Sequence, residues 1–83
     1  MREEKYGKLI KINLNKINKI MPFINETRKF ISDIDIMTDR VILDAKSIIG
    51  VHTLDLSQEI YVGILSDDVN EIEKFESAME EFR

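Results

Sequence analysis

The sequence contains no cysteine, and this absence excludes disulfide bonds, cysteine-based zinc sites and thiol chemistry. It contains a single histidine, His52, so a mechanism that needs two imidazoles is excluded as well. No uninterrupted hydrophobic run approaches the ~18 residues of a membrane-spanning helix, and the polar segment 1–5 is unlike a signal peptide. We therefore expect a cytoplasmic protein with no membrane partner.

Glycine and aromatic residues are scarce. The three glycines, Gly7, Gly50 and Gly63, are scattered and form no phosphate-binding loop. Six basic residues fall within 1–20, but they alternate with Ile and Leu as on the solvent face of a strand, and few aromatic residues accompany them. The net charge is −4, and seven of the acidic residues lie in 67–83. These features indicate that nucleic acid is not a partner.

Two acidic pairs remain as candidates for metal ligands or acid–base catalysis. Asp33 and Asp35 alternate along a predicted strand and share its solvent face, whereas Asp67 and Asp68 lie where a helix start favours negative charge. His52 has no nucleophile at a recognisable spacing and no second histidine with which to hold a metal. The sequence therefore indicates no metal, no cofactor and no enzyme active site.

Hydrophobic periodicity predicts a single domain spanning residues 1–83. The segment 59–66 is apolar on both faces and is expected at the centre of a sheet, and a turn at Thr38-Asp39 predicts a hairpin. The fold class is α+β, an open-faced β-sandwich in which three helices cover one side of a four-stranded antiparallel sheet. The predicted order is a strand at 10–14, a helix at 18–30, strands at 33–36 and 41–43, a short helix at 47–54, a strand at 59–66 and a helix at 67–82.

The helix boundaries follow from capping residues and apolar spacing. Asn18 is the expected N-cap of the first helix, which places Pro22 in the first turn, where no intrahelical hydrogen bond is lost. Asp67-Asp68 opens the last helix, where acidic residues suit the helix dipole. The expected apolar faces are Ile17, Ile20, Met21, Ile24 and Ile31 in the first helix and Val69, Ile72, Phe75, Met79 and Phe82 in the last.

Ser47 is the residue with the clearest chemical role. It is the expected N-cap of the short helix, between Lys46 and the apolar Ile48-Ile49, so its hydroxyl lies beside free backbone amides. A phosphate there would be stabilised by those amides and would place about two negative charges next to an apolar patch. A plain capping serine is the alternative interpretation. His52, expected to be exposed, is interpreted as a surface or partner-contact residue.

The segment Asp44-Ala45-Lys46-Ser47-Ile48-Ile49-Gly50-Val51, followed by Leu54, resembles the regulatory-serine region of HPr, the phosphocarrier of the bacterial sugar phosphotransferase system. The segment Lys29-Phe30-Ile31-Ser32-Asp33-Ile34 resembles the passage from helix to strand that precedes it in that family. The resemblance covers nearly the whole chain, and it implies the same β-α-β-β-α-β-α fold.

The chain departs from the family pattern at the phosphoacceptor. HPr carries its phosphoryl group on a histidine just ahead of the first helix, in a Gly-x-His-x-Arg-Pro type of motif. Counting back from Phe30 without gaps places Lys16 at that histidine, with Asn18 and Lys19 where the family has Arg and Pro. His52 lies in a different helix. The family's carrier activity is therefore expected to be absent.

The resemblance leaves the regulatory serine in place. In Gram-positive relatives the serine that matches Ser47 is phosphorylated by a dedicated kinase, and the phosphoprotein binds a transcriptional regulator. By resemblance the chain is a non-catalytic regulatory or adaptor protein whose partners are an HPr kinase and a phosphotransferase-system protein or transcriptional regulator. The implied docking surface is Lys46, Ile48, Ile49, Val51 and His52. Two alternatives are a phosphocarrier that uses another acceptor such as His52, and a structural or homodimeric domain without phosphate chemistry.

Overall fold

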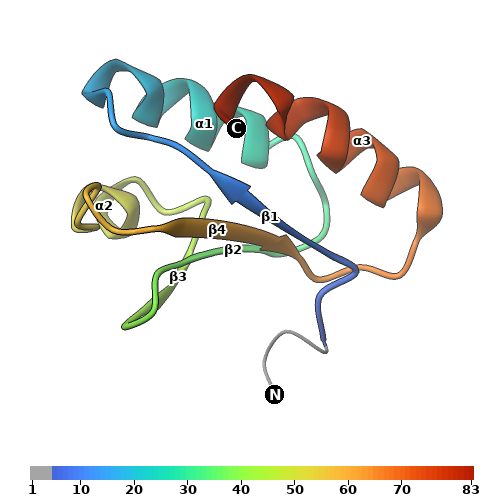
Figure 1. The fold of residues 1–83 in the computed structure, drawn as a ribbon. Helices are drawn as coiled ribbons and strands as arrows, with labels where there is room; N and C mark the ends of the chain where they lie inside the picture. The colour runs from blue at the N-terminus through green and yellow to red at the C-terminus, as the bar shows by residue number, and fades with distance from the viewer. Residues whose placement is uncertain (1–4) are drawn as a thin grey trace.

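Four strands form the antiparallel sheet of the computed structural model, which describes residues 5–83 except for the side chain of Ile17 (Figure 1). The sheet order is β1-β4-β2-β3, so β4 pairs with β1 on one side and with β2 on the other. The segment that is apolar on both faces was predicted to lie at the centre of the sheet, and this prediction is confirmed. The predicted hairpin of β2 and β3 is confirmed as well. The strands are β1 (Lys8–Ile12), β2 (Ile34–Met37), β3 (Ile42–Asp44) and β4 (Ile60–Ile64).

Three α-helices accompany the sheet: α1 (Ile20–Thr27), α2 (Ile48–His52) and α3 (Val69–Met79). In Figure 1, α1 and α3 lie above the sheet, and α2 lies at the end of the sheet where β3 leads into it. The predicted α+β class and element order are confirmed. None of the described helices is both long and apolar enough to span a bilayer.

The core lies between the helices and one face of the sheet. Ile60, Val62 and Ile64 of β4 are almost completely buried there, as strand alternation requires. Two aromatic pairs join segments of the helical layer to one another. The rings of Phe23 and Phe82 meet edge to face with their centroids 5.5 Å apart, and those of Phe30 and Phe75 do so with their centroids 6.1 Å apart. Edge-to-face pairs of this kind contribute about 0.5–1.5 kcal/mol each beyond the area they bury.

The first helix is shorter than predicted. A 3-10 turn at Ile17–Lys19 precedes α1, and Lys19 rather than Asn18 occupies the N-cap position, without a side-chain hydrogen bond. Pro22 does lie in the first turn of α1, as expected. The helix ends at Thr27, whose hydroxyl donates to the Ile24 carbonyl at 2.7 Å. The chain leaves the helix three residues earlier than the predicted end.

The shorter helix changes which apolar side chains are buried. Ile31 was predicted on the buried face but is 96% exposed, because it lies beyond the helix end. Met21 is also exposed, and Phe23 takes the buried position next to Ile24. In α3 the first predicted core residue, Val69, is 66% exposed because it occupies the first turn of the helix. The described remainder of both predicted stripes is buried or half-buried: Ile20, Ile24, Ile72, Phe75, Met79 and Phe82.

Tyr6 covers part of the sheet face that carries no helix. Its hydroxyl donates to the carboxylate of Asp35 on β2 at 2.6 Å. Its ring lies against Gly63 of β4, where an added Cβ would come within 2.7 Å of a ring carbon. Gly63 is therefore required by close approach, and the residue that approaches it is Tyr6.

We expect Gly63→Ala to lower the free energy of unfolding by about 1–3 kcal/mol, since the new methyl group displaces the Tyr6 ring. In a Tyr6→Ala background the same substitution should cost less, because the two closest contacts of the new methyl group are then gone and only the one with Leu9 Cδ1, at 3.0 Å, remains. Urea unfolding of the four variants of this double-mutant cycle measures the coupling. Equal costs in both backgrounds would contradict the proposed contact.

Candidate functional site

Ser47 is the N-cap of α2, as predicted. Its hydroxyl accepts a hydrogen bond from the backbone N–H of Gly50 at 3.1 Å, and its own backbone is extended, with φ −89° and ψ 114°. Its carbonyl accepts from the N–H of Val51 at 3.0 Å. Because α2 has only five residues, few hydrogen bonds hold it, and the cap is a large part of what fixes the helix start.

An apolar patch lies directly beside Ser47. Ile49 is 80% exposed and Ile48 is 38% exposed, although both are large aliphatic residues. Val51, predicted as part of the docking surface, is instead fully buried in the core. The correction follows from helix geometry, since residues on opposite sides of so short a helix face solvent and core respectively. The patch is therefore Ile48 and Ile49, without Val51.

Lys46 and His52, predicted to flank this patch, both make hydrogen bonds to backbone carbonyls. The Lys46 ammonium donates to the Phe30 carbonyl at 2.6 Å, and the side chain is only half-exposed. The His52 ring is exposed, with Nδ1 lying 2.7 Å from the Ile48 carbonyl oxygen, one helical turn earlier. That distance places the N–H of the imidazole on Nδ1 and leaves Nε2 to face solvent.

Arg28 joins the end of α1 to the residue before Ser47. Its Nε donates to the carbonyl of Lys46 at 3.0 Å. That carbonyl belongs to the peptide unit whose nitrogen is Ser47 N, so a guanidinium lies one peptide unit from the serine. The Lys46 bond to Phe30 runs in the opposite direction between the same two segments. Sequence periodicity missed Arg28, because a long-range bond of this kind leaves no local pattern.

Lys16, which the resemblance places at the phosphoacceptor position, lies on an exposed segment between β1 and α1. Its carbonyl accepts from the N–H of Lys19 at 3.0 Å and so starts the 3-10 turn that leads into the helix. Lys16, Asn18 and Lys19 carry no carboxylate, imidazole, thiol or hydroxyl. In this part of the chain no side chain is suited to accept a phosphoryl group.

Asp55 follows α2 and organises the loop that leads to β4. Its carboxylate accepts hydrogen bonds from the hydroxyl of Ser57 at 2.6 Å and from the backbone N–H of Ser57 at 3.0 Å. These two bonds favour the charged form and hold the pKa of Asp55 below its ordinary value. Among residues 5–83, no group of three or more acidic or histidine side chains is placed to hold a metal ion.

Comparison with known proteins identifies the fold. The chain matches no protein-family model and no curated protein sequence. Among solved structures it is similar to the phosphocarrier protein HPr from Bacillus anthracis str. Ames, with a TM-score of 0.67 and 22% identity over 92% of this chain and 94% of that one. It is also similar to HPr-C-His from Thermoanaerobacter tengcongensis, with a TM-score of 0.62 and 25% identity over 88% of this chain and 89% of that one. The chain therefore has an HPr-like fold.

We expect Ser47→Ala to lower the free energy of unfolding by about 1 kcal/mol, because the Gly50 N–H loses its acceptor. Ser47→Asp should stay close to the wild type, since aspartate is also a good N-cap. The matched control Ser77→Ala removes an exposed helical serine and should change stability by less than about 0.5 kcal/mol. Urea unfolding curves measure all three, and equal effects of the alanine and aspartate variants at position 47 would contradict the capping role.

Proposed function

We propose that this chain is a non-catalytic, HPr-like regulatory or adaptor protein of the sugar phosphotransferase system, controlled by phosphorylation of Ser47. Its partners are other proteins, namely an HPr kinase and a regulator or phosphotransferase-system component that docks on α2. The observation that carries the proposal is the position of Ser47, which caps an exposed helix directly beside the solvent-facing Ile48 and Ile49.

The fold supports a role in this system, since both structures described above are HPr proteins and match along nearly the whole chain. The sequence at the expected phosphoacceptor supports an adaptor rather than a carrier. A lysine ammonium has no free electron pair with which to attack phosphorus. With Lys16 at that position, the family's usual route of transfer has no nucleophile.

A phosphoryl group on Ser47 would change the α2 surface in two ways. It would add about 1.5–2 negative charges beside two exposed isoleucines, which weakens purely apolar docking and favours a partner with basic groups. It would also lie close to Arg28, whose guanidinium already binds the preceding peptide unit. The modified surface combines a charge and an apolar patch, and a partner can recognise the two together.

The alternative carrier uses His52. The exposed Nε2 of this residue is the one observation in its favour, because an imidazole nitrogen that faces solvent can attack a phosphoryl donor. Against it, Nδ1 is engaged with the Ile48 carbonyl, and no described acidic side chain contacts the ring to stabilise an imidazolium. We therefore favour phosphorylation of Ser47.

Incubation with ATP and a bacterial HPr serine kinase tests the proposal. We expect intact-mass spectrometry to show the addition of a single phosphoryl group, resistant to mild acid as a serine ester is. The group should be absent from Ser47→Ala and retained in Ser57→Ala, the matched control that removes an exposed serine from the following loop.

Failure of the wild type to gain a phosphoryl group, or equal labelling of the Ser47→Ala variant, would contradict the proposal. The carrier alternative predicts a different result. With phosphoenolpyruvate and the first enzyme of the phosphotransferase system, it requires an acid-labile phosphate that His52→Ala abolishes.

A further inference from the structure

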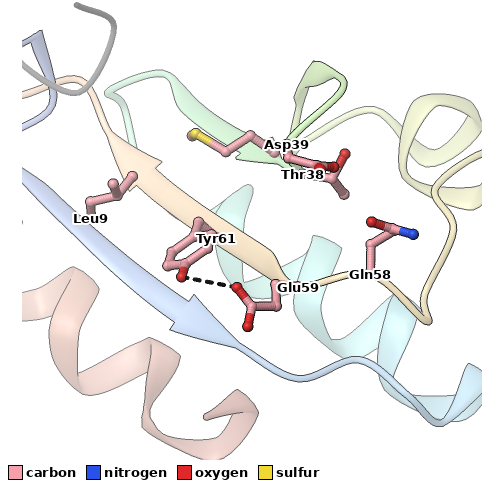
Figure 2. A pocket seen from close by; sticks show the side chains of 7 residues that line it. Leu9, Thr38, Asp39, Gln58, Glu59 and Tyr61 are labelled. Atoms are coloured by element: carbon pink, nitrogen blue, oxygen red, sulfur yellow. Dashed lines mark hydrogen bonds between the residues drawn. The ribbon is translucent and has the colours of Figure 1, made fainter.

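A hollow of about 440 Å³ lies on the sheet face opposite the helices (Figure 2). Its floor is formed by the side chains of Leu9 on β1, Met37 on β2 and Tyr61 on β4. These residues alternate along their strands with core residues such as Val62, so they point away from the core. The sheet therefore has a second, partly exposed apolar surface, formed by residues other than those of the α2 patch.

The rim of the hollow is polar and acidic. Thr38 and Asp39 come from the turn between β2 and β3, while Gln58 and Glu59 come from the two residues that precede β4. In Figure 2, Leu9 and Gln58 lie at opposite ends of the hollow, with Tyr61 between them. Among residues 5–83, the lining of the hollow includes two carboxylates and no lysine or arginine.

The two carboxylates differ in whether they already interact with other side chains of the protein. Among the described residues, Asp39 makes no hydrogen bond and no ion pair. Glu59 is 3.3 Å from the Lys11 ammonium and 3.4 Å from the Tyr61 hydroxyl. An incoming positive charge would therefore find one free carboxylate, at Asp39, and one that is partly neutralised, at Glu59.

The central strand beneath the hollow, β4, has no free hydrogen-bonding edge. Tyr61 pairs with Lys11 on one neighbouring strand and with Met37 on the other. An extended peptide cannot add to a strand that is paired on both sides, so recognition here depends on side chains alone. The volume falls within the range of small-molecule sites, roughly 300–1,000 Å³.

We propose that this hollow binds a small organic cation with a flat apolar body, that is, an aromatic amine. The apolar body lies on Leu9, Met37 and Tyr61, and the ammonium group is directed to Asp39 and Glu59. The ring of Tyr61 supplies an aromatic surface for stacking, and the rim carboxylates reject an anionic ligand of the same shape. This site is independent of phosphorylation at Ser47.

Tryptamine is the probe, with two matched compounds that share its indole ring. Tryptophol carries a neutral hydroxyl in place of the amine, and indole-3-propionate carries a carboxylate. In ¹H–¹⁵N NMR titrations of the whole chain we expect tryptamine to shift the amides of Leu9, Met37, Thr38 and Tyr61, with a Kd on the order of millimolar for a ligand of this size. Tryptophol should bind several-fold more weakly, and indole-3-propionate should cause no saturable shifts.

Two pairs of substitutions separate charge recognition from general effects. Asp39→Asn with Glu59→Gln should weaken tryptamine binding roughly three- to tenfold, as expected for two exposed charge pairs. Asp67→Asn with Glu73→Gln changes the net charge equally at exposed sites outside the hollow and should leave the Kd unchanged. Equal affinity for tryptamine and tryptophol, shifts located elsewhere, no binding, or equal effects of both variants would overturn the proposal.

Discussion

The pairing of β4 on both sides is the constraint on which the rest of the structure depends. β4 is hydrogen-bonded to β1 and β2 and contributes Ile60, Val62 and Ile64 to the core, so it fixes the centre of the sheet and the plane on which the helices pack. The same strand is also apolar on its other face, through Tyr61 and Gly63. One face of β4 therefore contributes to the core. The other face forms part of the floor of the hollow and packs against the ring of Tyr6.

The α2 region has a different physical character. It is a five-residue helix whose first turn is capped by the Ser47 hydroxyl and whose Val51 is buried in the core. Two hydrogen bonds to backbone carbonyls also hold this region, one from Arg28 to Lys46 and one from Lys46 to Phe30. Few interactions hold it, and two of its isoleucines face solvent. A covalent change at the cap therefore acts on an element whose surface carries two exposed isoleucines.

Much of this arrangement could be predicted from local sequence patterns. Alternation located the first three strands, although β1 begins and ends two residues earlier than predicted, and the doubly apolar segment located β4 and identified it as central. Ser47 was identified as a cap because a serine before an apolar run is a local signal. Patterns failed where tertiary contacts decide the outcome. Ile31 reads as part of a helical stripe but lies beyond a helix that ends at Thr27, whose hydroxyl bonds to the Ile24 and Ala45 carbonyls.

The candidate site was less predictable than the fold, because it depends more on tertiary contacts. The burial of Val51 and the bond from Arg28 to Lys46 depend on how α2 packs against α1, which no local spacing records. The hollow left a weak signal, since Tyr61 and Leu9 are apolar at outward-facing strand positions. The acidic rim beside these residues is visible only in the structure, because it depends on where the turn between β2 and β3 lies.

The central claim is that phosphate chemistry on this fold resides at Ser47 and not on a nitrogen. Phosphorus-31 NMR tests it most directly, on one sample supplied with both donor systems: ATP with an HPr kinase, and phosphoenolpyruvate with the first enzyme of the phosphotransferase system. We expect a single phosphomonoester resonance from the protein. A phosphoramidate resonance from the protein, with or without the phosphomonoester, would contradict the claim, because it would show that the chain carries phosphate on nitrogen.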